Sequence, residues 1–258
     1  MVILLHGLGE HSSRYAHLGK FLAENGFSVK SFDLRGHGKS EGKRGDTPSY
    51  DAYIKDIDVF LLSIPDLLST PHFLYGHSLG AILAISYVLS RNPPLNGVIC
   101  TGVALHNSLE TQRIKLALVK ILGRVVPRLT IPSGLDPNAL SRDPEIVNSY
   151  INDPLVHDHA SLGFALEMIN EIASIWENAN RFPVPLLLMH GGKDQIAFPN
   201  SSSEFARLVE KSCTLKIWKE MYHEIHNEIG KEMVFNYLIE WLNERTISPP
   251  STEPDFTF

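Results

Sequence analysis

A serine, an aspartate and a histidine of this chain stand where they could act as nucleophile, orienting acid and base. Ser78 lies in Gly76-His-Ser-Leu-Gly80, between the apolar run Phe73–Tyr75 and the helix-forming run Ala81–Leu89. A G-x-S-x-G segment between strand and helix is a sharp turn that exposes the serine side chain, and its glycines leave room for neighbouring backbone. Because the same pattern also occurs in structural turns, the interpretation depends on partner residues.

A serine hydroxyl is a weak nucleophile at neutral pH, and it needs a base that a carboxylate holds in place. After a strand–turn–helix serine of this kind, the partners follow in the order acid, then histidine. Asp194 comes after the apolar run Leu186–Met189 and a glycine turn, and His223 comes after the run Leu215–Trp218. We therefore predict a catalytic triad of Ser78, Asp194 and His223.

Other histidines compete for these roles. His226 lies one helical turn beyond His223, and we expect it either to contact substrate or to be a partly buried surface histidine. We prefer His223 as the base because it is the first histidine after the strand. His190 closes a strand before a tight turn and is interpreted as structural, and His77 is expected in the wall of the site.

The tetrahedral intermediate of acyl transfer needs two N–H donors for its oxyanion. We expect Leu79, the residue after the nucleophile, and Leu8, in the loop His6-Gly-Leu-Gly9, to supply them from the backbone. Leucine suits both positions because only the main chain takes part. The pair His157 and His159 lacks a third ligand in a matching context, so we predict no metal site.

The segments that must position these residues alternate between strands and helices. Short apolar runs are typical of parallel strands that are buried on both faces. The predicted strands are Met1–Leu5, Phe27–Leu34, the run into Ser78, Gly97–Val103, Leu186–Met189 and Leu215–Trp218, with helices such as Tyr50–Ser63 and Ala81–Ser90 between them. This alternation predicts an α/β fold with a mostly parallel sheet flanked by helices.

The alternation stops between Leu105 and Arg181, where we expect no strands and predict helices over 111–124, 144–151 and 161–178. We interpret residues 106–181 as a helical cap inserted over the strand ends. Residues 1–105 and 182–247 would then form the core of the fold. The polar, proline-rich residues 248–258 are expected to be disordered.

One cap segment, Arg113 to Val126, predicts an amphipathic helix. Its apolar positions are Ile114, Leu118, Ile121, Leu122 and Val125, and its basic positions are Arg113, Lys120 and Arg124. Such a helix suits a lipid interface, and it suits a cap helix packed on the body equally well. Peripheral membrane contact through the cap is therefore one of two expectations.

Composition narrows the remaining classes of function. The 258 residues are 43% hydrophobic, enough to bury a full core, and a net charge of −6 without a long basic run argues against a nucleic-acid binder. The two cysteines, Cys100 and Cys213, lie in apolar runs, as expected for buried thiols in a reducing compartment. Without a run of about 18 apolar residues or a secretory signal, we expect a cytoplasmic protein or one peripheral to membranes.

Six motifs spread over nearly the whole chain, cap included, match a known family. They are His6-Gly-Leu-Gly-Glu-His-Ser-Ser-Arg-Tyr15, Phe32-Asp-Leu-Arg-Gly-His-Gly-Lys-Ser40, Gly76-His-Ser-Leu-Gly80, Leu140-Ser-Arg-Asp143, Asp153-Pro-Leu155 and Tyr222-His-Glu-Ile-His226. The chain resembles the monoacylglycerol lipases and related bacterial lysophospholipases of the α/β-hydrolase superfamily. This resemblance implies an α/β-hydrolase fold and cofactor-free hydrolysis of a monoacylglycerol, a small lipid ester, by Ser78, Asp194 and His223.

The resemblance also concerns substrate binding and the start of the sheet. In the family the glycerol end is bound near the oxyanion loop and the cap, which here points to Glu10, Arg14, Tyr150 and His226. Glu10 and Arg14 form a structural ion pair in the alternative interpretation. Such hydrolases usually have two antiparallel strands ahead of the first strand, and their apparent absence would leave the 27–34 strand at a sheet edge.

Two rival functions remain. The first keeps the triad and changes the substrate, as in a lysophospholipase, a broad carboxylesterase or an aminopeptidase of the same superfamily. An aminopeptidase needs a carboxylate for a free amine, and Glu10 is the obvious candidate. The second rival is a non-catalytic receptor or scaffold, which has no need of serine, aspartate and histidine in this order.

Overall fold

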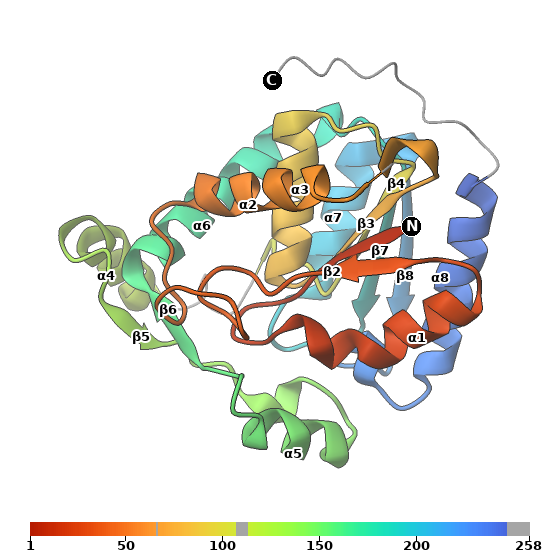
Figure 1. Cartoon of the computed structure of the whole chain (residues 1–258). Helices are drawn as coiled ribbons and strands as arrows, with labels where there is room; N and C mark the ends of the chain where they lie inside the picture. Colours follow the sequence, from red (N-terminus) through yellow and green to blue (C-terminus); the bar gives the residue numbers. More distant parts are fainter. Residues whose placement is uncertain (66, 107–112, 247–258) are drawn as a thin grey trace.

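The computed structural model describes residues 1–65, 67–106 and 113–246. In these residues the centre is a six-stranded sheet of order β2-β1-β3-β4-β7-β8, and every neighbouring pair is parallel (Figure 1). The strands are β1 (Val2–Leu5), β2 (Val29–Ser31), β3 (Phe73–His77), β4 (Gly97–Thr101), β7 (Leu186–Gly191) and β8 (Cys213–Trp218). The predicted α/β fold is confirmed.

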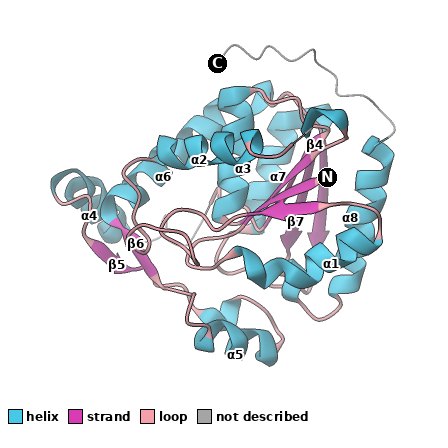
Figure 2. Ribbon diagram, in the orientation of Figure 1, coloured by secondary structure: helices cyan, strands magenta, loops and turns pink. Residues whose placement is uncertain are grey.

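Burial on both faces of the sheet explains why these apolar runs form strands. Every residue of β1, β3, β4 and β7 is buried, as expected for parallel strands between helical layers. Four helices cover one face, and their bounds are α2 (Tyr50–Leu62), α3 (Leu79–Arg91), α6 (Leu162–Asn178) and α7 (Pro199–Val209). The other face packs against α1 (Ala16–Glu24) and α8 (Lys231–Thr246) (Figure 2).

A short strand forms the sheet edge beside β1. β2 covers only Val29–Ser31, whereas the pattern predicted a strand over residues 27–34. Beyond it the chain leaves the sheet, and Phe32 packs on Phe60 of α2 with 4.5 Å between ring centroids. Among the described strands β2 has β1 as its one neighbour, so its outer backbone groups are unpaired within the sheet.

The segment between β4 and β7, which we call the inserted segment, extends to one side of the sheet (Figure 1). It contains α4 (Arg113–Val125), α5 (Pro144–Asn152) and α6. The prediction that it has no strand is wrong, because β5 (Thr130–Pro132) and β6 (His159–Ser161) pair antiparallel. Each of these strands has only three residues, and β5 ends in a proline, so neither shows the alternation that identifies a strand in a sequence. Residues 107–112 and the predicted tail, 248–258, lie outside the described residues.

This segment rests on two core loops through main-chain hydrogen bonds. The His157 N–H donates to Gly9 O at 2.8 Å, and the Ser161 N–H donates to Gly45 O at 2.7 Å. Gly45 has a φ of +66°, and a Cβ there would lie 1.9 Å from His159 O, so the contact requires glycine. Because Gly9 follows β1, the segment contacts the carboxyl-terminal edge of the sheet, where ligands of such folds bind.

Candidate active site

Ser78 lies on a strained turn between β3 and α3. Its φ of 51° and ψ of −112° form a conformation that costs on the order of 1–3 kcal/mol for a residue with a Cβ. A Cβ on Gly76 would lie 2.2 Å from Gly80 O, and one on Gly80 would lie 2.2 Å from Leu5 O. The Ser78 N–H donates to Thr101 O at 2.9 Å, which ties the turn to β4.

Asp194 follows β7 and is held on both carboxylate oxygens. Oδ1 accepts the N–H groups of Ile196 at 2.8 Å and Ala197 at 2.9 Å, while Oδ2 lies 2.7 Å from His223 Nδ1 and 3.0 Å from His190 Nε2. Burial alone would raise the pKa of Asp194, but the His223 charge and the hydrogen bonds from both histidines hold that pKa well below its usual value. Asp194 is therefore an anion at neutral pH.

His223 follows β8 and packs beside the serine turn. Its ring centroid lies 4.7 Å from that of His77, and a Cβ on Gly102 would lie 3.1 Å from His223 Nδ1. Burial lowers the pKa of His223, but the Asp194 charge and hydrogen bond, together with the charges of Glu224 and Glu10, raise it, and the net shift is upward. Among the described residues no Ser78–His223 hydrogen bond is formed, and such bonds often tighten only when substrate binds.

The glycine-rich loop after β1 meets the serine turn. A Cβ on Gly7 would lie 3.4 Å from Ser78 Cβ, and the Gly7 N–H donates to Glu10 Oε1 at 2.6 Å. Leu8 is the next loop residue and is partly buried, while Leu79 is the first residue of α3. The two N–H groups predicted to bind an oxyanion thus belong to segments that converge at Ser78.

Three of the four residues predicted to bind the glycerol end come together. Arg14 Nη1 lies 2.5 Å from Glu10 Oε2, and the Arg14 guanidinium lies 4.8 Å from the centroid of the Tyr150 ring. Tyr150 belongs to α5, so this cluster joins the core to the inserted segment. Glu10 is 2% exposed and Tyr150 is 7% exposed, so the cluster is nearly closed to solvent.

The fourth residue, His226, is fully buried in an aromatic cluster. Its ring stacks on Tyr15 at 4.6 Å between centroids and meets His77 edge-on at 4.8 Å. Neither ring nitrogen has a hydrogen-bond partner among the described residues, and burial holds the pKa of His226 well below its usual value. The partly buried surface position that we considered is therefore wrong, and the predicted substrate contact lacks an exposed surface in this arrangement.

Two further residues lie beside the Asp194–His223 pair, and sequence reasoning gave neither a role in the reaction. His190, interpreted as structural, contacts Asp194 through its Nε2, and its Nδ1 lies 2.7 Å from Ser202 Oγ. Glu224 is 1% exposed and pairs with Arg14. Their positions next to the predicted triad were visible in the sequence, but their partners depend on packing between distant segments.

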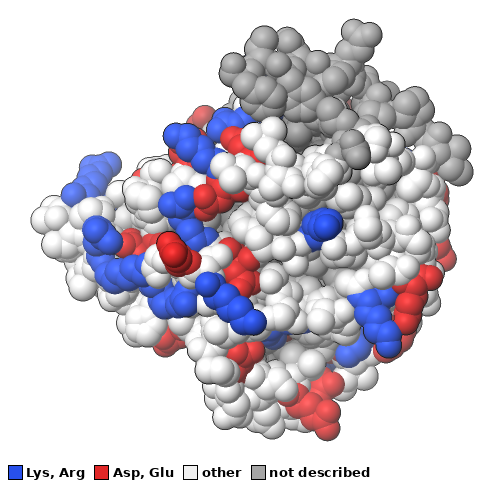
Figure 3. All heavy atoms as spheres, viewed as in Figure 1, with Lys and Arg blue, Asp and Glu red and all other residues white. Residues whose placement is uncertain are grey.

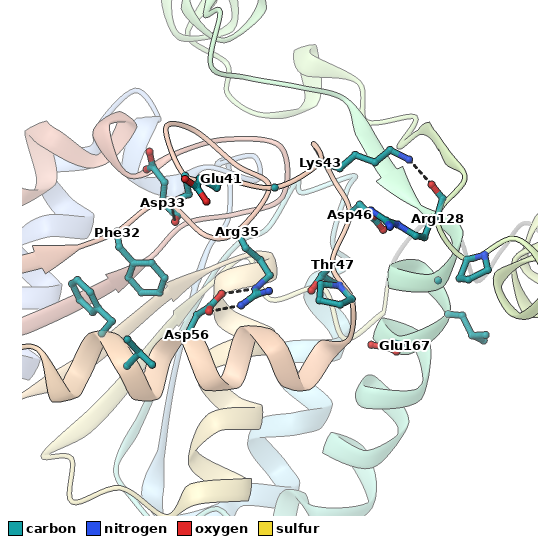
Figure 4. Close-up of a pocket in the computed structure, with 18 of the residues that line it drawn as sticks. Phe32, Asp33, Arg35, Glu41, Lys43, Asp46, Thr47, Asp56, Arg128 and Glu167 are labelled. Atoms are coloured by element: carbon teal, nitrogen blue, oxygen red, sulfur yellow. Dashed lines mark hydrogen bonds and ion pairs between the residues drawn. The ribbon is translucent and has the colours of Figure 1, made fainter.

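A large open cavity of about 1020 Å³ lies away from these residues, between the 32–48 loop, α2 and the inserted segment (Figure 4). Its lining includes Arg35, which pairs with Asp56, and Arg128, which pairs with Asp46. Ser78, Asp194 and His223 do not line it. Its size therefore does not identify it as the catalytic pocket.

Two kinds of feature are absent from the described residues, a metal cluster and a membrane-spanning helix. No group of three or more histidine, cysteine, aspartate or glutamate side chains in the described ranges is arranged to hold a metal ion. Within the same ranges, no helix has the length and apolar character needed to cross a bilayer. Cys100 is buried as expected, whereas Cys213 is only partly buried.

The chain is similar to a described protein family and to several individual proteins. Residues 1–230 match the family described as Serine aminopeptidase, S33. An uncharacterized abhydrolase domain-containing protein of Dictyostelium discoideum is 40% identical over 257 residues, which are 98% of this chain and 27% of that protein. The monoacylglycerol lipase of Mycolicibacterium smegmatis is 30% identical over 247 residues, 94% of this chain and 87% of that one. The crystal structure of Paleococcus ferrophilus monoacylglycerol lipase superposes with a TM-score of 0.88 and 39% identity, covering 95% and 94% of the two chains.

These similarities extend over the core and the inserted segment alike. The chain spans only about a quarter (27%) of the length of the Dictyostelium relative, but most of each lipase. The parallel sheet, the serine turn and the named lipases together support lipolytic hydrolase activity. The chain belongs to the serine aminopeptidase S33 family of α/β-hydrolases, alongside the monoacylglycerol lipases, and is a hydrolase that acts on esters.

Proposed function

We propose that this protein hydrolyses monoacylglycerols to glycerol and a free fatty acid through an acyl-enzyme on Ser78. The observation that carries the proposal is the buried Asp194–His223 hydrogen bond of 2.7 Å, whose histidine packs beside the residue that precedes Ser78. The similarity to proteins named monoacylglycerol lipases supports the substrate class.

The mechanism assigns one role to each group. Ser78 Oγ attacks the ester carbonyl carbon while His223 Nε2 accepts the hydroxyl proton, and Asp194 stabilises the imidazolium through the Nδ1–H. The backbone N–H groups of Leu8 and Leu79 stabilise the oxyanion. His223 returns the proton to the departing glycerol oxygen, and a water molecule then attacks the acyl-enzyme in the same way to release the fatty acid and restore the serine.

The polar end of the site favours a neutral glycerol ester over the alternative, a lysophospholipid. Arg14 is already paired with two carboxylates, Glu10 at 2.5 Å and Glu224 at 2.6 Å. Its positive charge is therefore compensated within the protein, which leaves little attraction for a phosphate group. The Tyr150 ring of α5 lies 4.8 Å from the Arg14 guanidinium, and we propose that it contacts the glycerol.

The test compares a long-chain monoacylglycerol with the corresponding lysophosphatidylcholine as substrates. We expect the monoacylglycerol to be preferred, and Ser78→Ala to lower kcat/KM by roughly 10⁴-fold or more with an unchanged circular dichroism spectrum. Ser203→Ala, which removes a serine hydroxyl on α7, should keep full activity. Activity in Ser78→Ala would refute the nucleophile, and preference for the lysophospholipid would support the alternative.

We also propose that α4 brings the protein to lipid surfaces. Its side chains Leu118, Ile121, Leu122 and Val125 are 36–72% exposed rather than packed on the body. Lys120, Arg124 and the nearby Arg128 are exposed as well, and Figure 3 shows basic side chains gathered at this end of the molecule. The side chains of Arg113 and Ile114 lie outside the described part. An exposed apolar stripe beside basic residues suits an anionic bilayer, which would also contain the substrate.

Replacing Ile121 and Val125 together by serine should weaken binding to anionic vesicles on the order of 10- to 100-fold, because apolar area leaves the interface. Cosedimentation measures the binding. Val59→Ser on α2, where an equally apolar side chain is 67% exposed, is the matched control and should bind like the wild type. Unchanged binding by the double variant would exclude α4 as the contact.

A further inference from the structure

A buried ion cluster joins the two loops that carry the proposed catalytic groups. Arg14 lies on the short 3-10 turn before α1 and pairs with Glu10 on one side and Glu224 on the other. We propose that the Glu10–Arg14–Glu224 bridge fixes the position of the oxyanion loop relative to His223. Glu224 is then a positioning residue for the reaction. This inference rests on the roles proposed above for Ser78 and His223.

The Glu224 end of the bridge fixes an orientation as well as a distance. Arg14 Nη1 donates to Glu224 Oε1 at 2.6 Å, and Arg14 Nη2 donates to Glu224 Oε2 at 2.8 Å. Asn227 Nδ2 donates to Oε2 at 2.7 Å, and the Glu224 N–H donates to Leu140 O at 2.8 Å. A bidentate pair of this kind has little rotational freedom. Because Glu224 directly follows His223, restraining Glu224 restrains the backbone that carries the base.

The Glu10 end holds the oxyanion loop in the same way. Glu10 Oε2 accepts from Arg14 Nη1 at 2.5 Å, while Oε1 accepts from the Gly7 N–H at 2.6 Å and from the Tyr15 hydroxyl at 2.5 Å. Gly7 immediately precedes Leu8, the proposed oxyanion donor. A continuous series of hydrogen bonds thus runs from the oxyanion loop through Arg14 to the residue after the base.

The burial of the cluster argues for a geometric role. The side chains of Glu10, Arg14 and Glu224 are 3%, 9% and 2% exposed. Buried ion pairs often stabilise a fold no more than well-packed apolar residues would, because both charges lose hydration. What an ion bridge adds is fixed distances between its ends. Here both ends are loops that must present N–H groups and an imidazole to one substrate carbonyl.

The bridge also contributes charge at the base. The charged or titratable groups near His223 include Asp194, Glu224, Glu10 and the rings of His77 and His226. Burial lowers the pKa of His223, Asp194 raises it most strongly, and Glu224 and Glu10 raise it further. Removing the Glu224 charge should therefore lower the pKa of His223 and move the acidic limb of kcat/KM to lower pH.

The test uses two substitutions and a matched control. Glu224→Gln removes the charge with little change in shape, and Glu224→Asp keeps the charge but shortens the reach by one methylene. Asp46→Asn is the control, since Asp46 is a buried carboxylate of the 32–48 loop that pairs with Arg128, at 3.3 Å. Each variant is assayed over a range of pH on a monoacylglycerol, and the concentration of active sites is counted by fluorophosphonate labelling of Ser78.

We expect Glu224→Gln to lower kcat per labelled site about 10- to 100-fold through misplacement of the base, with KM within about twofold of wild type. Its acidic limb moves to lower pH. Glu224→Asp should lower kcat while its acidic limb stays in place. Asp46→Asn should lower thermal stability and leave both kcat per site and the acidic limb unchanged.

Wild-type kcat and an unshifted acidic limb in Glu224→Gln would overturn the inference, as would an equal loss of kcat and an equal shift of the limb in Asp46→Asn. If Glu224→Gln does not fold, Glu224→Asp decides, because wild-type kcat in that variant is incompatible with a positioning role. A wild-type protein that the probe does not label would instead refute the proposed function.

Discussion

The single residue that controls the pH dependence of the proposed reaction is His223, because it must be neutral to accept the Ser78 proton. Its net pKa shift is upward: burial lowers the pKa of His223, while the Asp194 charge and hydrogen bond and the charges of Glu224 and Glu10 raise it. A raised pKa means that the neutral base forms only at higher pH. We therefore expect kcat/KM to rise with pH along a limb above the usual imidazole pKa of about 6.5.

Asp194→Asn tests whether the Asp194 carboxylate sets the pH at which kcat/KM rises. It removes the carboxylate that lies 2.7 Å from His223 Nδ1, so the limb should move to lower pH. The plateau should fall on the order of 10⁴-fold, because the asparagine no longer holds the required tautomer. The measurement is a pH–rate profile with a water-soluble ester, and a wild-type limb at or below pH 6.5 would contradict the electrostatic account.

At the scale of elements, the start of α3 is packed directly on β1. A Cβ on Gly80 would lie 2.2 Å from Leu5 O, which is backbone and cannot swing away. Gly80→Ala should therefore destabilise the fold by about 1–3 kcal/mol or more. Urea unfolding followed by circular dichroism measures the change.

Gly19→Ala is the matched control for Gly80→Ala. Gly19 lies inside α1, and the nearest atom to an added Cβ is Val29 Cγ1 at 3.9 Å. Alanine there should stabilise the protein by about 0.5–1 kcal/mol, because glycine loses more conformational freedom in a helix. Equal stabilities for the two variants would mean that α3 can shift away from β1.

At the scale of the whole molecule, the inserted segment is held on the core by close backbone contacts. A Cβ on Gly45 would lie 1.9 Å from His159 O, and the φ of Gly45 is +66°. Gly45→Ala should displace β6, raise KM for long-chain monoacylglycerols severalfold, and cost about 1–3 kcal/mol of stability. The assays are steady-state kinetics and thermal unfolding.

Gly26→Ala separates the backbone strain from the displaced segment. Gly26 also has a positive φ, +86°, but nothing lies within 4 Å of an added Cβ. The Gly26→Ala variant should therefore be less stable than the wild type, while its KM stays at the wild-type value. If the KM of Gly45→Ala also matches that of the wild type, the contact between Gly45 and β6 does not influence substrate binding.

Local sequence determined much of this protein. Apolar runs become buried parallel strands because both of their faces must leave water, and turn residues such as Gly76 and Gly80 mark where a strand passes into a helix. Ser78, Asp194 and His223 were named from their positions after such strands, and the Asp194–His223 contact was expected from chain order alone. The family resemblance rests on the same short segments.

Tertiary structure alone decided what depends on packing between distant segments. Arg14 and Glu224 are 210 positions apart, and no local pattern shows that they meet. The same holds for the three-residue pairing of β5 with β6 and for the complete burial of His226. Periodicity reports which face of an element is apolar, whereas the partner of a buried charge or ring is chosen by the arrangement of the whole chain.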